Sequence, residues 1–182
     1  RRTMLIYSDE LEEYQEEEEI PDYPVHLFFT RDGYFKKITP QSLRMSGEQK
    51  LKEGDMIVQQ LESTNNVDLL FFTDKAQVYK AKASDFGDTK ASVLGEYIPA
   101  KLGMDEGENA LYMAVTKDYS GYMLFFFENG KAARVEVSAY QTQTRRKKLT
   151  GAYSDKSPLV SALRLTQDVE MAVTSTEGRC MV

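Results

Sequence analysis

Residues 25–40, VHLFFTRDGYFKKITP, decide how the rest of the chain is interpreted. The stretch predicts an apolar strand, a tight turn at Asp32-Gly33 and a second strand that carries two lysines. Similar stretches return at residues 67–83, 121–137 and 168–182. Their turn positions fall at Gly33, Ala76, Gly130 and Gly178, with intervals of 43, 54 and 48 residues. Such a period is typical of a propeller-like array with one small sheet per repeat.

Between these hairpins the sequence predicts longer connections that end in further strands. Two of these strands follow Glu53-Gly54 and Glu106-Gly107, and a third covers residues 159–165. Helical periodicity is weak, and Pro99 with the glycines around it breaks the segment 83–102 into short pieces. We therefore predict an all-β fold, a β-pinwheel or propeller-like array of four-stranded antiparallel blades. About three blades are complete and a fourth is partial, at residues 25–66, 67–117, 118–167 and 168–182.

The turn residues predict how each hairpin is closed. Asp32-Gly33 and Asn129-Gly130 favour a two-residue type I′ turn, in which both central residues have positive φ. Glu177-Gly178 is a weaker form of the same signal. The second repeat has Lys75-Ala76 instead, and because alanine is strained in a left-handed conformation, we expect a different turn there.

Charge is distributed unevenly along the chain, whose formal net charge is −6. Residues 1–24 hold nine acids and two bases, a net charge of −7, and residues 25–182 hold 20 acids and 21 bases, a net charge of +1. Acidic blocks repel themselves, and Pro21 and Pro24 disfavour a helix. We interpret residues 1–24 as a junction and an acidic linker, with a short helix at residues 10–19 as the alternative.

Composition excludes several classes of protein. The chain has 182 residues and 41% hydrophobic content, enough to build a core. There is no run of apolar residues long enough for a membrane span, and the first residues lack the pattern of a signal peptide. The single cysteine, Cys180, cannot form an intramolecular disulfide, which fits a reducing cytoplasm.

The sequence predicts no catalytic site, no metal site and no cofactor. His26 is the single histidine and is interpreted as a packing or rim residue. Zinc-ligand spacing and a P-loop are both missing. The kinase tripeptide at Asp85-Phe86-Gly87 has no accompanying kinase motif and is attributed to chance. The clustered phenylalanines are expected to form the blade core: Phe28, Phe29, Phe71, Phe72, Phe125, Phe126 and Phe127.

A base recurs four residues after the turn in three repeats, at Lys37, Lys80 and Arg134. If the blades are related by rotation, these side chains form a row along one rim, to which Lys36 and Lys82 add. Regularly spaced bases can follow DNA phosphates without reading the base sequence. The alternative is that lysines on exposed edge strands prevent aggregation.

The one run of four bases lies in the connection after the third hairpin: Arg145, Arg146, Lys147 and Lys148. On a loop, this run is a compact phosphate contact, and the alternative is a merely solvated loop. Residues 9–22 either compete with DNA for the basic rim or act as a spacer or solubilising tail.

With these features, the chain resembles the C-terminal domain of the A subunit of bacterial type IIA topoisomerases, DNA gyrase and topoisomerase IV. Residues 68–80, DLLFFTDKAQVYK, resemble the recurrent strand-turn-strand of that family. Residues 30–37, TRDGYFKK, resemble its first-repeat form, and Arg1-Arg2-Thr3 resembles the junction where the catalytic core ends. The resemblance covers essentially the whole chain.

This resemblance implies a β-pinwheel that bends duplex DNA around its basic outer edge, as an accessory domain of an ATP-dependent type II topoisomerase. The implied partners are the rest of the A subunit, with the B subunit reached through it, in the bacterial cytoplasm at the nucleoid. Gyrases carry a glycine- and arginine-rich box after the first hairpin, whereas residues 41–54 hold only scattered bases. That difference favours a topoisomerase IV-like subunit or a divergent gyrase. A protein-interaction propeller without DNA binding is the alternative hypothesis.

Overall fold

The structure, a computed structural model, describes residues 19–141, 148–165, 173–174 and 180–181. Its strands are β1 (Pro24–Thr30), β2 (Tyr34–Ile38), β3 (Ile57–Thr64), β4 (Asp68–Thr73), β5 (Val78–Lys82), β6 (Glu96–Tyr97), β7 (Ala110–Thr116), β8 (Tyr122–Phe127), β9 (Ala132–Glu136), β10 (Lys148–Leu149), β11 (Leu159–Leu165), β12 (Val173–Thr174) and β13 (Cys180–Met181). The helices are short: α1 (Pro40–Met45), α2 (Ile98–Lys101) and the 3₁₀ segments η2 (Ala83–Asp85) and η3 (Val137–Tyr140).

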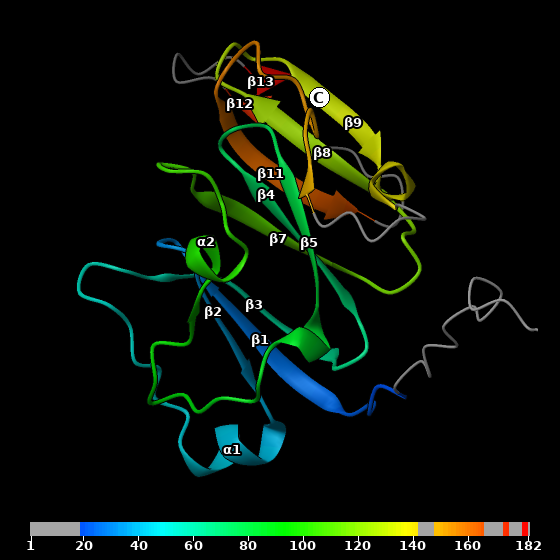
Figure 1. Cartoon of the computed structure of the whole chain (residues 1–182). Coiled ribbons are helices and arrows are strands. Elements are labelled where there is room, and N and C mark those ends of the chain that lie inside the picture. Colours follow the sequence, from blue (N-terminus) through cyan, green and yellow to red (C-terminus); the bar gives the residue numbers. More distant parts are fainter. Residues whose placement is uncertain (1–18, 142–147, 166–172, 175–179, 182) are drawn as a thin grey trace, which may run out of the picture.

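The strands form small antiparallel sheets that repeat one pattern (Figure 1). The first sheet has the order β3-β1-β2-β6, and the second, taken in the same sense, has the order β7-β4-β5-β10. The third has the order β11-β8-β9, and β12 pairs with β13 in the fourth repeat. The expectation of an all-β array of antiparallel blades is confirmed, because each hairpin is flanked by the strand that follows it in its own repeat.

The outermost strand of a sheet comes from the next repeat. β6, in the second repeat, pairs with β2, and β10, in the third, pairs with β5. This differs from the expectation that each repeat supplies its own four strands. Within the described residues, the third sheet has three strands. Neighbouring repeats are therefore interlocked, and a sheet is not one contiguous stretch of sequence.

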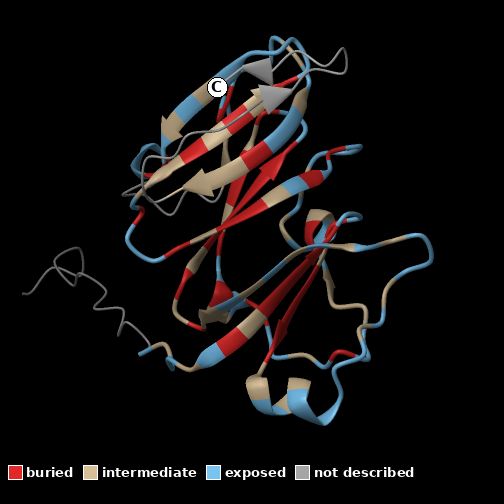
Figure 2. Ribbon diagram, turned by 180° about the vertical axis from the view of Figure 1, so that it is seen from behind, coloured by how far each residue is buried: buried red, intermediate tan, exposed pale blue. Residues whose placement is uncertain are grey.

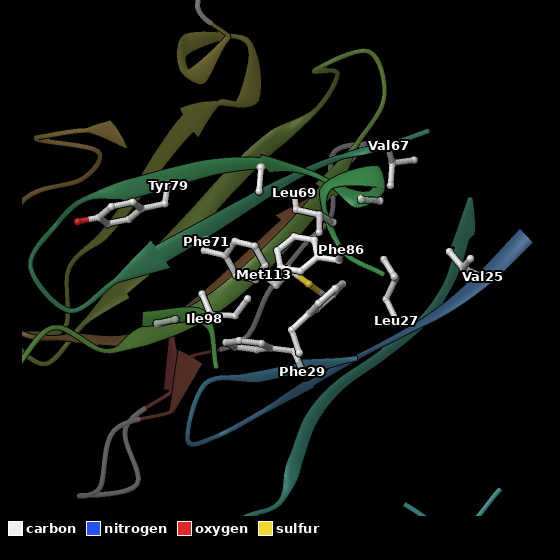
Figure 3. Close-up of a cluster of buried hydrophobic side chains, with 14 residues drawn as sticks. Val25, Leu27, Phe29, Val67, Leu69, Phe71, Tyr79, Phe86, Ile98 and Met113 are labelled. Carbon is white, nitrogen blue, oxygen red and sulfur yellow. The ribbon is translucent and has the colours of Figure 1, made fainter. Parts of the chain in front are cut away.

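Strand β4 is buried on both faces because the second sheet lies between the other two. Leu69 and Phe71 pack against Leu27 and Phe29 of the first sheet (Figure 3). The alternate β4 side chains, Leu70 and Phe72, belong to a second cluster that includes Phe125 of the third sheet. A strand buried on both faces is expected to be a continuous apolar run rather than an alternating one.

The phenylalanine prediction holds with one exception. Six of the seven are buried, and Phe126 is half-buried because it points away from the second cluster. In Figure 2, the buried residues run along the central strands of the sheets, whereas the loops are mostly exposed.

The hairpin turns are not of type I′ as predicted. Gly33 and Gly130 have positive φ, of 94° and 79°, whereas Asp32 and Asn129 do not. The amide of Gly33 donates to the Thr30 carbonyl at 3.0 Å, as in a type I turn followed by a left-handed glycine. The dipeptide therefore marks the turn correctly, but only its glycine is left-handed.

The expectation of a different turn at Ala76 is also wrong. Ala76 has φ of 55°, the same left-handed region as Gly33. Its methyl group is buried in the second cluster, and its carbonyl accepts a hydrogen bond from the Ala152 amide at 2.8 Å. Burial and this hydrogen bond offset the strain of about 1–2 kcal/mol that the left-handed conformation costs.

The helical pieces are short, as the weak periodicity predicts. The segment 83–102 consists of η2, a loop, β6 and α2. Helix α1 was not anticipated; Pro40 begins it, and the Thr39 hydroxyl accepts a hydrogen bond from the Ser42 amide at 3.3 Å. The expected junction and most of the acidic linker, with the alternative helix, lie outside the described residues.

Candidate nucleic-acid interface

The three bases of the shared offset occupy equivalent register positions. Lys37 lies opposite Leu27, Lys80 opposite Leu70, and Arg134 opposite Leu124. Their exposure nevertheless differs, because Lys37 is 2% exposed, Lys80 is half-buried and Arg134 is exposed. The repeat therefore places the three bases equivalently along their strands without giving them equal access to a ligand.

Lys37 is bonded inside the protein. Its Nζ donates to Asn65 Oδ1 at 2.6 Å and to the Ala83 carbonyl at 2.9 Å, and lies 3.6 Å from Asp88 Oδ1. Burial lowers the pKa of Lys37, and the Asp88 carboxylate opposes that shift. The expectation that Lys37 faces phosphates on an open rim therefore requires correction, because its ammonium group is already fully partnered.

Lys36 is corrected in the same way. It is 1% exposed, and burial lowers its pKa. Its Nζ donates to Gln49 Oε1, the Lys50 carbonyl and the Ala91 carbonyl at 3.2, 2.7 and 3.1 Å. All three donors of the ammonium group have partners, so Lys36 has none left for a phosphate.

The remaining members of the row lie against tyrosine rings. Lys80 Nζ is 5.4 Å from the ring centre of Tyr119, whose hydroxyl donates to Asp68 Oδ2 at 2.8 Å. The guanidinium of Arg134 is 4.9 Å from the ring centre of Tyr122. Burial lowers the pKa of Lys80, and the Asp68 carboxylate opposes the shift. Cation–π contacts of this kind orient a base against the ring.

Lys82 and Lys148 lie on two neighbouring strands, β5 and β10. Lys82 is exposed at the end of β5, and Lys148 is in β10, which pairs with β5. Lys148 Nζ is 3.2 Å from Asp105 Oδ2, and the Asp105 and Tyr79 side chains raise the pKa of Lys148. The other three bases of the run, Arg145, Arg146 and Lys147, lie outside the described residues.

Glu108 is a buried carboxylate that the sequence reasoning missed. It is 3% exposed and accepts hydrogen bonds from Thr73 Oγ1 and the Tyr79 hydroxyl, both at 2.7 Å. Tyr79 also contacts Lys148, whose Nζ is 5.6 Å from its ring centre. Glu108 therefore holds the ring against which the end of the basic run lies. Its signal in the sequence was its position directly after the Glu106-Gly107 turn.

The two edges of each sheet have different surroundings. One edge, here called the linked edge, is formed by β3, β7 and β11 and joins successive sheets. Between the first and second sheets, the Gln59 side chain exchanges hydrogen bonds with the Met113 backbone at 2.8 and 2.7 Å. Between the second and third sheets, the Tyr112 hydroxyl accepts a hydrogen bond from the Arg164 amide at 3.1 Å. The opposite edge, here called the far edge, carries β6 and β10. Lys148, the last base of the run, is therefore on the far edge.

The residues that could carry other chemistry have ordinary surroundings in the described part of the chain. No three His, Cys, Asp or Glu side chains there are grouped to hold a metal ion. His26 is half-buried, with its Nδ1 4.0 Å from Glu62 Oε1, and Phe86 of the kinase-like tripeptide is a core residue. None of the helices described is both long and apolar enough to cross a bilayer.

Comparisons with known proteins agree with one another. The family described as the DNA gyrase C-terminal domain, a β-propeller, matches residues 68–92 and 122–164. The A subunit of DNA topoisomerase 4 from Staphylococcus aureus is 25% identical over 96% of this chain and 23% of its own length. The chain thus spans about a quarter of the length of the curated relatives it matches.

Solved structures show the same relationship. A C-terminal domain of DNA topoisomerase IV is 26% identical, with a TM-score of 0.69 over 79% of this chain and 46% of that one. The C-terminal domain of E. coli ParC is 16% identical, with a TM-score of 0.64 over 86% of this chain and 63% of that one. The DNA gyrase A C-terminal domain is 19% identical, with a TM-score of 0.55 over 87% of this chain and 53% of that one. The last two comparisons show the fold alone.

Proposed function

We propose that this chain, which is similar to the C-terminal β-pinwheel domains of bacterial type IIA topoisomerase A subunits, binds and bends duplex DNA through phosphate contacts along its far edge. It reads no base sequence, since lysine and arginine contacts to phosphate carry no sequence information directly. The proposed partners are duplex DNA and the rest of the A subunit, with the B subunit reached through it.

One observation carries the proposal. Lys148, which ends the run of four bases, is in β10 at the far edge of the second sheet, held by Asp105 and Tyr79. Exposed Lys82 ends the strand beside it. The proposed phosphate contacts are Lys80, Lys82, Arg134, Arg145, Arg146, Lys147 and Lys148. Lys36 and Lys37 are omitted because their ammonium groups bind protein oxygens.

In the whole protein, the domain is proposed to be an accessory part of an ATP-dependent type II topoisomerase that acts in the bacterial cytoplasm at the nucleoid. Strand cleavage belongs to another domain. The missing glycine- and arginine-rich box after the first hairpin favours a topoisomerase IV-like subunit or a divergent gyrase over a wrapping gyrase.

Duplex binding measured over a salt series tests the proposal. For each phosphate contact, the slope of log K against log salt steepens by about 0.9. Replacing residues 145–148 by glutamine is therefore expected to make the slope shallower by about 3.6. The matched control replaces four exposed bases elsewhere by glutamine: Arg44, Lys117, Lys131 and Lys156. An equal loss in both variants would indicate a general charge effect and would contradict a defined interface.

A second candidate function, protein interaction, has one specific observation in its favour. Each edge strand of the linked edge has a β-bulge, and the extra residue is an exposed aliphatic: Val58, Leu111 and Val160. Exposed apolar side chains that repeat in this way are typical of a docking surface. No duplex binding at low salt, together with loss of binding to a purified topoisomerase A-subunit core after Leu111→Asp, would favour this function instead.

A further inference from the structure

Two loops of the first sheet meet over the ammonium group of Lys36. The first, residues 46–56, connects α1 to β3 and provides Gln49 Oε1 and the Lys50 carbonyl. The second, residues 86–95, connects η2 to β6 and provides the Ala91 carbonyl. Because an ammonium group has three donors and no acceptor, one buried side chain holds both loops.

The two loops also contact each other and the sheet. The Lys50 amide donates to the Ala91 carbonyl at 2.8 Å. Gly95 lies directly on β2, because a Cβ atom there would be 2.4 Å from the Phe35 carbonyl oxygen and 2.7 Å from Lys36 Cγ. Both loops run along the same side of the first sheet, beside β2 (Figure 1). The pair is therefore a built part of the sheet edge.

The two loops that hold this buried ammonium group carry three exposed bases. Lys50 and Lys52 are exposed on either side of half-buried Leu51, and exposed Lys90 directly precedes Ala91. The carboxylate closest to Lys90 in sequence, Asp88, is turned to other partners: it accepts from the Tyr23 hydroxyl at 2.9 and 3.0 Å and lies 3.6 Å from Lys37 Nζ. The loops that meet at Lys36 therefore carry exposed bases, together with the exposed carboxylates Glu48 and Glu53.

We propose that Lys50, Lys52 and Lys90 are the phosphate contacts of the first sheet, and that Lys36 is the residue that positions them. The inference rests on the proposed function, duplex binding. It extends the basic track from β10, on the far edge of the second sheet, to the corresponding edge of the first sheet beside β6. Buried Lys36 thus holds the two loops from inside the first sheet, and the exposed bases of these loops are its proposed phosphate contacts.

The variant Lys50→Gln/Lys52→Gln/Lys90→Gln tests the contacts. Its salt slope for duplex binding is expected to be shallower by about 2.7 than that of the unmodified chain. The matched control, Lys117→Gln/Lys131→Gln/Lys156→Gln, removes the same charge from other exposed positions and is expected to keep the slope. If the unmodified chain binds DNA and the first variant keeps its slope, this inference fails while the proposed function stands. If the unmodified chain does not bind at low salt, both fail.

Lys36→Met tests the positioning role, since methionine keeps the apolar stem and removes the three donors. The expected results are at least tenfold faster hydrogen exchange at the Lys50 amide and a shallower salt slope in the folded protein. A purely structural role would lower the melting temperature without changing that slope. Gln49→Ala removes one surface-side acceptor and provides a second variant if Lys36→Met does not fold. An unchanged slope and unchanged exchange in the folded variant would overturn the role of Lys36.

Discussion

The first and third sheets differ at one equivalent position. Lys37 of β2 is 2% exposed and has three oxygen partners, whereas Arg134 of β9 is exposed against a tyrosine ring. The strand pairing is the same in both sheets, because each base lies opposite a leucine of the preceding strand. Strand register therefore places a side chain, but its neighbours decide whether it is available.

The coverage of the first sheet comes from residues far away in the sequence. Asn65 follows β3, Ala83 begins η2, and the loop 86–95 passes over Lys36 from the next repeat. Within the described residues, the third sheet has no strand beyond β9. Similar repeats in the sequence thus have differently exposed bases, because a different connection covers each repeat.

The largest expected difference in stability between the two sheets is for glycine substitutions. Gly95→Ala is expected to destabilise the fold by about 3 to 5 kcal/mol, because its φ is positive and the new Cβ would overlap backbone. Gly130→Ala is expected to cost about 1 to 2 kcal/mol, because nothing lies within 4 Å of the added atom. Urea unfolding of both variants measures the difference, and equal losses would contradict the close packing over the first sheet.

The next largest difference in stability between the two sheets is expected when the equivalent bases, Lys37 and Arg134, are replaced. Lys37→Ala is expected to cost about 3 kcal/mol, because it leaves Asn65 Oδ1 and the Ala83 carbonyl without their donor. Arg134→Ala is expected to cost at most about 1 kcal/mol, the scale of an exposed cation–π contact.

For DNA binding, we expect the opposite order, with a larger effect of Arg134→Ala than of Lys37→Ala. Arg134→Ala is expected to make the salt slope shallower by about 0.9, whereas folded Lys37→Ala keeps it. Thermal unfolding and duplex binding on the same samples test both halves of the comparison. A shallower slope for Lys37→Ala would show that its ammonium group reaches DNA.

At alkaline pH, the buried tyrosines and the buried lysines are expected to change the free energy of unfolding in opposite directions, and by less than the substitutions above. Burial raises the pKa of Tyr140, near the third sheet, and burial with the hydrogen bond to Asp68 raises that of Tyr119. The unfolded chain then loses these protons first, so stability falls as the pH rises above about 10. Burial lowers the pKa of Lys36 and Lys37, so the folded chain loses those protons first. Their contribution to stability therefore increases with pH below about 10.5.

Urea midpoints measured from about pH 8 to about pH 11 resolve the two contributions. Tyr140→Phe is expected to weaken the fall above about pH 10, and Lys36→Met to weaken the rise below it. Each pKa unit of difference corresponds to about 1.4 kcal/mol. Identical profiles for both variants and the unmodified chain would argue against burial as the cause of the shifts.

Much of the fold was predictable because hairpins are local. The spacing of Gly33, Ala76 and Gly130 located three turns, and the four apolar residues at 69–72 identified a strand that is buried on both faces. The turn type was not predictable, because Asp-Gly and Asn-Gly fit both a type I′ turn and a type I turn with a left-handed glycine. Ala76 was misjudged because its strain is compensated by long-range packing and a hydrogen bond to Ala152.

The candidate interface was only partly predictable. The equivalent register of Lys37, Lys80 and Arg134 followed from the sequence, and so did the basic run that ends at Lys148. The burial of Lys36 and Lys37 did not, because a lysine beside an apolar residue in a strand has the same sequence pattern whether solvent or a loop covers it. Glu108 was missed because its partners, Thr73 and Tyr79, are 35 and 29 residues away.

By itself, the sequence determined the repeat, the class of fold and the strand positions of the bases, because hairpin turns and apolar strands depend on residues that are close together in the chain. Only the tertiary structure decided which bases are buried and which are exposed to solvent. Strand exchange brings β6 and the loop 86–95 from the second repeat onto the first sheet, and burial depends on such contacts between distant segments.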